Sequence, residues 1–239
     1  MGRRWRLLFQ DEARFGCISD QRRCWAPLPF RPVVGHQIIR QFVYGLAAVS
    51  PRDGQFCSLV LPWLDTEAMS LFLAHTAAQF PNDYCVMLLD GAGWHTALDL
   101  QAPPWMQLLP LPSYSPELNP VEHIWDHLRE NHFGNRLFRS LEEVVEQLCL
   151  GLRQLHRQPK LVQSMTCFDW IKALPLTFSS DYPRWWVRID GENTTLTLSS
   201  RSEFAGTTGF CGLENPRFAA RAAQLCFACT GKPISESLG

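Results

Sequence analysis

The chain has 239 residues, of which 46% are hydrophobic, enough for one buried core of ordinary size and an appendage. Its formal net charge of −1 argues against a uniformly basic, polyanion-binding protein. The charges are nevertheless separated along the chain: residues 1–40 carry eight arginines and three acids, whereas residues 41–130 carry two arginines and ten acids. A phosphate-binding rim around a cation-binding centre would show this pattern, and ordinary solvated charge explains it equally well.

No segment reads as a membrane span or a secretory signal. The longest run without charged residues, 100–116, is interrupted by four internal prolines, which a spanning helix does not tolerate. The N-terminal arginines are followed by only three apolar residues, 7–9, before an acidic pair. We therefore expect a cytoplasmic protein without a membrane partner.

The first part of the chain reads as strands followed by one helix. Apolar runs of β type span residues 5–10, 41–49 and 56–61. The turn-forming residues 51–54 separate the last two runs and predict a hairpin. Asp65 can cap a helix whose apolar positions recur at helical spacing until Pro81. A buried strand is then expected over 84–89.

The second part alternates strand and helix. A short strand is expected over 105–111, and Asn119 opens a helix with one apolar stripe. Ser140 and Glu143 form a capping box for another helix, whose period continues to about His156. Strands followed by alternating strands and helices predict an α/β sheet covered by helices.

The composition changes after Leu174, where Ser, Thr, Gly and Asn become frequent. One hairpin is expected around Asp190 and Gly191. We therefore predict a folded domain over residues 1–174 and a C-terminal tail of poorly defined structure over residues 175–239.

Three acidic residues stand where sites assemble in open α/β sheets. Asp11 is expected at the end of the first strand, Asp90 at the end of the 84–89 strand, and Glu122 in the first turn of a helix. Each has a structural explanation: a turn cap for Asp11, an Asx turn for Asp90, and a fold back onto a free backbone amide for Glu122. If the three converge, each pair at about 4 Å repels by roughly 4 kcal/mol at an effective dielectric of 20. Such a cluster needs cations, and its oxygen ligands suit Mg²⁺ or Mn²⁺.

A histidine close to one of these acids leaves two interpretations open. His95 follows Asp90 by five residues. It could orient a carboxylate or contact a phosphate, and a satisfied structural histidine is equally consistent with the sequence. We therefore do not assign it a catalytic role from the sequence.

Three stretches around the acids carry a resemblance to a known family. They are FQDEARF at 9–15, LDGAGWH at 89–95 and, most specifically, LPSYSPELNPVEHIW at 111–125. With their order and the 31 residues between Asp90 and Glu122, they resemble the DDE transposases of the mariner superfamily, in particular its bacterial insertion-sequence branch. The resemblance covers about 170 residues.

The resemblance implies an RNase H-like fold, with a five-stranded mixed sheet flanked by helices. It places Asp11, Asp90 and Glu122 on the three metal-binding catalytic carboxylates of the family. Two Mg²⁺ or Mn²⁺ ions would serve an Mg-dependent endonuclease and DNA strand transfer: one activates water at the transposon end, and the other stabilises the leaving oxygen. The freed 3′ hydroxyl then attacks target DNA. The implied partners are double-stranded DNA, as transposon ends and target, and a second copy of the chain as a homodimer.

Two departures from the family suggest an alternative function. Met1 stands ten residues before Asp11, where the family carries a helix-turn-helix region, and the tail 175–239 matches nothing in the family, as read-through would. The chain could therefore depend on a separately encoded helix-turn-helix protein. Alternatively, it is an inactive transposase remnant that at most binds DNA or a partner. A third alternative is a structure-selective nuclease of the same fold. Such a nuclease would lack the sequence motif at residues 113–122, so this alternative fits the chain least well.

Overall fold

The computed structural model describes residues 3–18, 21–35, 38–95, 97, 99–112 and 115–174, and two short strands beyond them. Those strands, β6 (Arg188–Ile189) and β7 (Leu196–Thr197), pair antiparallel. The predicted turn at Asp190 and Gly191 lies outside the described residues, as does the rest of the 175–239 tail. No helix in the described part is both long and apolar enough to cross a membrane.

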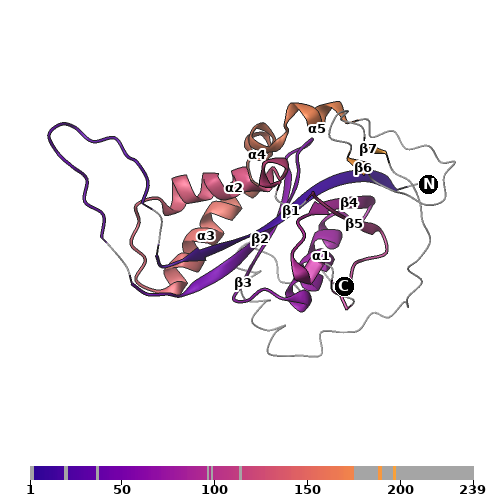
Figure 1. Ribbon diagram of the computed structural model, residues 1–239, viewed down its shortest axis with the longest axis horizontal. Coiled ribbons are helices and arrows are strands. Elements are labelled where there is room, and N and C mark those ends of the chain that lie inside the picture. The colour runs from indigo at the N-terminus through magenta and orange to yellow at the C-terminus, as the bar shows by residue number, and fades with distance from the viewer. Residues whose placement is uncertain are drawn as a thin grey trace.

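Five strands form one mixed sheet with helices on both faces (Figure 1). They are β1 (Arg4–Gly16), β2 (Phe42–Ser50), β3 (Gln55–Leu61), β4 (Asp83–Leu89) and β5 (Met106–Pro110). Their order is β3-β2-β1-β4-β5. β1 pairs antiparallel with β2 and parallel with β4, while β2–β3 is antiparallel and β4–β5 is parallel. This order and these directions confirm the predicted RNase H-like α/β fold.

Helices cover the sheet unequally. The described α-helices are α1 (Thr66–Gln79), α2 (Val121–Leu128), α3 (Leu141–His156), α4 (Pro159–Thr166) and α5 (Asp169–Ala173). α1 packs on one face, and the other four gather on the opposite face (Figure 1). Asp65 caps α1 by accepting from the Ala68 amide at 2.8 Å, and Ser140 caps α3 by accepting from the Glu143 amide at 3.4 Å. Both predicted N-caps are confirmed, while the Glu143 carboxylate of the expected capping box accepts from the Arg139 amide at 2.8 Å.

The predicted β2–β3 hairpin is also confirmed. Gly54 in its turn has a φ of 67°, a conformation that favours glycine. Its amide donates to the Ser50 carbonyl at 2.8 Å. The turn packs against the start of α4, where a Cβ on residue 54 would overlap the Pro159 carbonyl. The hairpin is thus fixed to the helical layer.

β1 is longer than predicted, so the expectation that Asp11 ends the first strand is wrong. The parallel pairing of β1 with β4 stops at Phe9 and Leu88. The antiparallel pairing with β2 continues to Gly16 and Phe42, and this pairing keeps the chain extended through the acidic residues. Asp11 therefore lies within β1, immediately beyond the end of its parallel ladder with β4.

The side chains of β1 alternate between two cores because successive strand residues point to opposite faces. Leu7 and Phe9 join the core beneath α2 and α3, whereas Leu8 joins the core against α1. The same alternation directs Asp11 toward α2 and Glu12 toward the other face.

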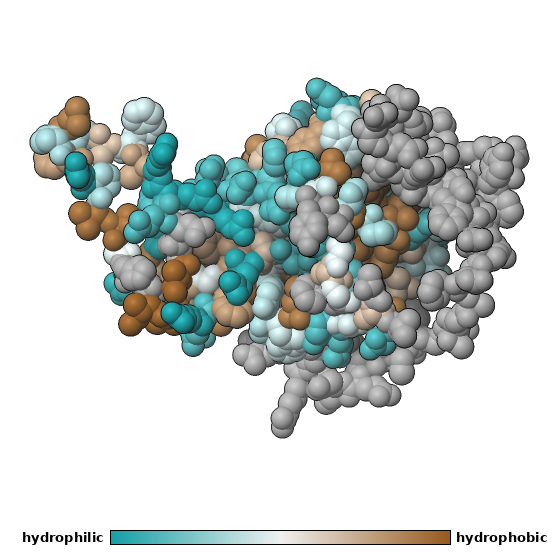
Figure 2. Space-filling model, viewed as in Figure 1, coloured by the Kyte–Doolittle hydropathy of each residue, from teal (hydrophilic) through white to brown (hydrophobic). Residues whose placement is uncertain are grey.

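Residues 21–35, between β1 and β2, form an arm that stands clear of the sheet (Figures 1 and 2). Asn135 fixes its base: the Asn135 side chain accepts from the Arg22 amide at 2.9 Å and donates to the Arg22 carbonyl at 2.8 Å. Large apolar side chains along the arm are exposed, namely Trp25, Leu28, Phe30 and Val33. The sequence patterns did not predict this projection.

Candidate active site

Two aspartates occupy equivalent positions on neighbouring parallel strands. Phe9 of β1 pairs with Leu88 of β4 as the last parallel pair. Two residues further along each chain stand Asp11 and Asp90, so the register brings both to the same edge of the sheet, with Asp90 already beyond the end of β4. Asp90 follows the end of β4 directly, as predicted.

α2 carries the third predicted carboxylate. The Asn119 side chain fixes the start of the helix, because its Nδ2 donates to the Gln10 carbonyl at 2.9 Å and its Oδ1 accepts from the first amide of α2 at 3.2 Å. Further along α2, Trp125 Nε1 donates to Asp11 Oδ2 at 2.9 Å. Glu122 lies between these two anchors in the first turn, as predicted.

The Glu122 carboxylate does not cap its own helix. The N-cap residue Pro120 has no side-chain cap bond, and within the described residues the Glu122 side chain makes neither a hydrogen bond nor an ion pair. Burial raises the pKa of Glu122; the Arg129 charge opposes the rise, and the charges of Asp126 and Asp90 add to it. The carboxylate is therefore held near other acids without a structural partner of its own.

Asp11 is the most strongly perturbed of the three acids. Burial raises the pKa of Asp11 to about 8, with further contributions from the charges of Glu122 and Glu12. The hydrogen bond from Trp125 opposes this rise only in part. Because Asp11 is only 9% exposed, water does little to stabilise its anion. A divalent cation would stabilise it, so the acid set fits a divalent metal with oxygen ligands.

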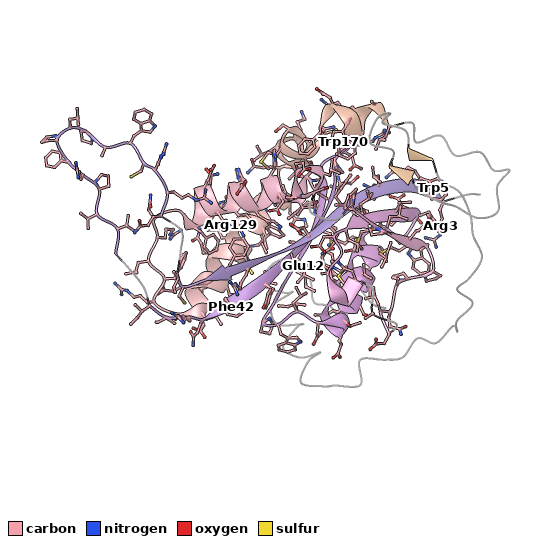
Figure 3. The ribbon with its side chains drawn as sticks, in the orientation of Figure 1. Arg3, Trp5, Glu12, Phe42, Arg129 and Trp170 are labelled. Carbon is pink, nitrogen blue, oxygen red and sulfur yellow. The ribbon has the colours of Figure 1, made fainter. Side chains whose placement is uncertain are left out.

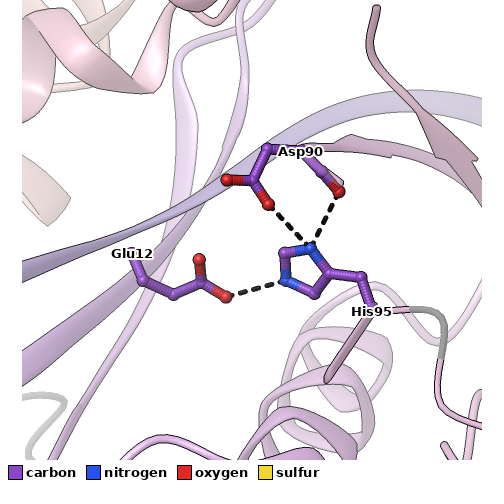
Figure 4. A group of neighbouring side chains, drawn as sticks. All are labelled: Glu12, Asp90 and His95. Carbon is purple, nitrogen blue, oxygen red and sulfur yellow. Dashed lines mark hydrogen bonds and ion pairs between the residues drawn. The ribbon is translucent and has the colours of Figure 1, made fainter. Parts of the chain in front are cut away.

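A second cluster adjoins the first and consists of Glu12, Asp90 and His95 (Figure 4). Among the described residues, their candidate ligand atoms all lie within 4.8 Å of one another, whereas Asp11, Asp90 and Glu122 are not gathered that closely. His95 ends a 3-10 turn, η1 (Gly93–His95), and its side chain is fully buried. The structure thus places the histidine noted in the sequence directly against one of the predicted site residues.

Both ring nitrogens of His95 face oxygen acceptors. Nε2 lies 2.9 Å from Glu12 Oε1, and Nδ1 lies 2.9 Å from both the carbonyl oxygen and the Oδ1 of Asp90. Since a carbonyl only accepts, Nδ1 carries a proton and donates to the Asp90 carbonyl, and Nε2 pairs with the Glu12 carboxyl. Burial lowers the pKa of His95, but Glu12 and then Asp90 raise it more, so the net shift is upward.

One arginine, Arg129, acts on the acidic site, and a second, Arg14, stacks on an aromatic ring. Arg129 acts electrostatically on Glu122 from the end of α2, and the exposed Arg14 stacks over the Phe42 ring at 4.8 Å. Figure 3 shows Arg129 and Phe42 on the arm side of Glu12. Of these two arginines, Arg129 is the one whose charge acts on a predicted site residue, Glu122.

Sequence reasoning missed three supporting residues. Trp125 belongs to the apolar stripe of α2 and is indeed buried, but its indole N–H also holds Asp11. Asn119 was interpreted only as the start of a helix. Glu12 was not singled out, since the residue after Asp11 points to the opposite face of a strand. The spacing of His95 from Asp90 was the available signal for the second cluster.

Comparison with known proteins defines the class. A family model described as DDE superfamily endonuclease matches residues 6–145, which is more than half of the chain and includes all three predicted carboxylates. The chain therefore belongs to the DDE superfamily endonuclease family. This confirms the family-level resemblance found in the sequence.

Individual relatives add detail. The uncharacterized protein y4pE/y4sA of Sinorhizobium fredii (strain NBRC 101917 / NGR234) is 38% identical over 130 residues, 54% of this chain and 96% of that protein. The structure of the Mos1 transposase paired-end complex with left transposon end matches with a TM-score of 0.46 and 16% identity, over 68% of this chain and 56% of that one. The Mos1 mariner paired end complex with Mn matches with a TM-score of 0.47 and 14% identity, over 70% and 55% of the two chains. This chain spans about half the length of the Mos1 chains.

Proposed function

We propose that this chain is the catalytic domain of a DNA transposase from the bacterial insertion-sequence branch of the mariner superfamily. Asp11, Asp90 and Glu122 are its metal ligands and hold two Mg²⁺ or Mn²⁺ ions. One observation carries the proposal: burial and Glu122 raise the pKa of Asp11, and Asp90 in turn contributes to the raised pKa of Glu122. Glu122 thus links the other two acids electrostatically, and carboxylates that repel in this way are suited to divalent cations. Membership of the endonuclease family supports phosphodiester chemistry.

The chain contributes orientation of the three acids. Trp125 fixes the carboxylate of Asp11, and the Asx turn at Asp90 fixes one of its oxygens through the Ala92 amide at 3.0 Å. Asn119 sets the position of the helix that carries Glu122. Two bound ions would stabilise charge on the attacking and leaving oxygens of an in-line displacement at phosphorus.

Double-stranded DNA is the proposed substrate, cut at transposon ends and joined to target through the freed 3′ hydroxyl. Arg129, whose charge acts on Glu122, is suited to contacts with DNA phosphates, which position a duplex without reading its sequence. In this proposal a homodimer holds two transposon ends. Binding should weaken steeply as salt is raised, since phosphate contacts release counterions.

The test is cleavage of labelled transposon-end DNA by the full chain in Mg²⁺ or Mn²⁺. We expect wild type to cut, and Asp90→Asn and Glu122→Gln to lose activity by on the order of a hundredfold or more, because even outer-shell partners of metal ligands cost about 10–100-fold. Asp99→Asn and Glu146→Gln, which neutralise exposed acids outside the site, are matched controls and should cut like wild type.

Each outcome has a definite meaning. Cleavage that survives Asp90→Asn or Glu122→Gln would contradict the proposed ligand set. A folded wild type that binds DNA but does not cut it under any of these conditions would favour the alternative of a DNA-binding or partner-binding module. Circular dichroism of every variant separates loss of chemistry from loss of fold.

A further inference from the structure

The position of Asp90 is not fixed by its strand. β1 and β4 stop pairing at Phe9 and Leu88, and Asp90 is the first residue beyond β4. Its side chain is 55% exposed, so packing does not hold the carboxylate either. If the Asp90 carboxylate were unrestrained, it would lose rotamer freedom on binding a cation. Contacts with neighbouring groups are therefore needed to fix its orientation beforehand.

His95 supplies those contacts and is itself held from the other side. Its Nδ1 lies 2.9 Å from both the carbonyl and the Oδ1 of Asp90, and its Nε2 lies 2.9 Å from Glu12 Oε1. The Glu12 side chain is 6% exposed and that of His95 is 0% exposed, so neither can move without disturbing the interior. The bridge joins β1 to the segment after β4 where their backbone pairing has ended.

These contacts divide the two oxygens of Asp90. Oδ1 accepts from His95 Nδ1 at 2.9 Å and from the Ala92 amide at 3.0 Å. Oδ2 makes no hydrogen bond within the part of the chain that the structure describes. One oxygen is therefore held by the protein, and the other is left for a cation.

We infer that Glu12 and His95 are positioning residues that hold Asp90 in its metal-binding orientation. The inference rests on the proposed function, because it takes Asp90 to be a metal ligand. Hydrogen-bonded partners behind metal ligands commonly play this part. The different arrangement, one ion bound by Glu12, Asp90 and His95 together, would need a free imidazole nitrogen, whereas each ring nitrogen already lies 2.9 Å from a protein oxygen (Figure 4).

The test measures Mn²⁺ affinity of the full chain by calorimetry, without DNA. His95→Phe keeps a ring but removes the His95 contact of the largely buried Glu12 carboxyl, so it is made together with Glu12→Gln. We expect this double variant to fold and to bind Mn²⁺ about 10–100-fold more weakly than wild type. Glu12→Gln alone keeps a hydrogen-bonding group opposite Nε2. We expect this single variant to bind Mn²⁺ within about threefold of wild type. His75→Phe, a buried histidine outside the site, is the matched control and should bind like wild type.

A second readout needs no metal. Proton–nitrogen NMR of the imidazole should show the Nδ1–H proton of His95 protected from exchange in wild type, and faster exchange of that proton in Glu12→Leu, where the ring is no longer held from its other side. Asp90→Asn is included to test the ligand itself. If Asp90→Asn abolishes Mn²⁺ binding but the double variant binds like wild type, the positioning role is overturned while the proposed function stands. If Asp90→Asn does not weaken Mn²⁺ binding, the proposed ligand set and the inference fall together.

Discussion

Asp11 sits where burial favours folding for its apolar neighbours but opposes its own ionisation. The carboxyl titrates near 3.8 when the chain is unfolded and with a pKa of about 8 when folded. The folded state therefore binds the proton more tightly, so the stability linked to Asp11 is fully present below about pH 4 and is lost as pH rises through 8. Metal binding needs the Asp11 anion, whereas the metal-free fold favours the neutral side chain. Replacing Asp11 by a neutral residue should therefore stabilise the metal-free protein.

We predict that Asp11→Asn raises the free energy of unfolding of the metal-free chain by on the order of a few kcal/mol at pH 9 and changes it little at pH 4. The asparagine keeps an oxygen to accept from Trp125 and removes the repulsion from Glu122 and Glu12. Urea denaturation in EDTA measures the effect. Glu146→Gln, an exposed change on α3, should leave the midpoint unchanged. An Asp11→Asn chain no more stable than wild type at pH 9 would contradict the proposed cost.

Among the elements, those with strong local signals could be predicted from sequence. α1 and α3 have a capping side chain and a sustained helical period, and the β2–β3 hairpin has a turn that needs Gly54. The continuation of β1 past Phe9 could not be predicted, because it depends on pairing with β2, which lies more than twenty residues later along the chain. α4 and α5 have eight and five residues, too short for a periodic pattern.

Some residues of the candidate site could likewise be predicted from the sequence, and others could not. Asp11, Asp90 and Glu122 could be identified because the text around them resembles a family. The bridge from Glu12 through His95 could not, since it joins two strands that pair only in three dimensions. Asn119 and Trp125 were recognised as helix-start and core residues, and only the structure shows that each also anchors α2 to β1.

The β2–β3 turn gives an element-level prediction. Gly54→Ala should lower the free energy of unfolding by about 2 kcal/mol or more, because alanine is strained at a φ of 67° and its Cβ would overlap the Pro159 carbonyl. Gly91→Ala is the matched control, since a Cβ at residue 91 meets nothing within 4 Å. Urea midpoints of the two variants measure the difference. Equal stability would show that the turn and α4 separate at no cost.

At the scale of the whole molecule, two histidines on opposite helical layers add an acid limit to stability. Burial lowers the pKa of His75 on α1 and of His156 at the end of α3 to about 4. His156 Nε2 lies 3.2 Å from the hydroxyl of Ser58 on β3. Their folded pKa values lie below the unfolded value of 6.5, so their contribution is fully present above about pH 6.5 and is lost as pH falls toward 4. Together with Asp11, they predict greatest metal-free stability near neutral to slightly acid pH.

We expect the metal-free wild type to lose up to about 3 kcal/mol per buried histidine between pH 6.5 and pH 4. In His156→Gln the amide can still bond to Ser58 but does not titrate, so about half of the histidine contribution should disappear. The opposing Asp11 contribution is common to both chains and cancels when the two slopes are compared. Urea denaturation across that range measures both slopes. His123→Gln replaces an exposed histidine and should keep the wild-type slope. If His156→Gln follows the wild-type slope as well, the acid limit originates elsewhere in the chain, because a residue that no longer titrates cannot be the source of an unchanged proton uptake on unfolding.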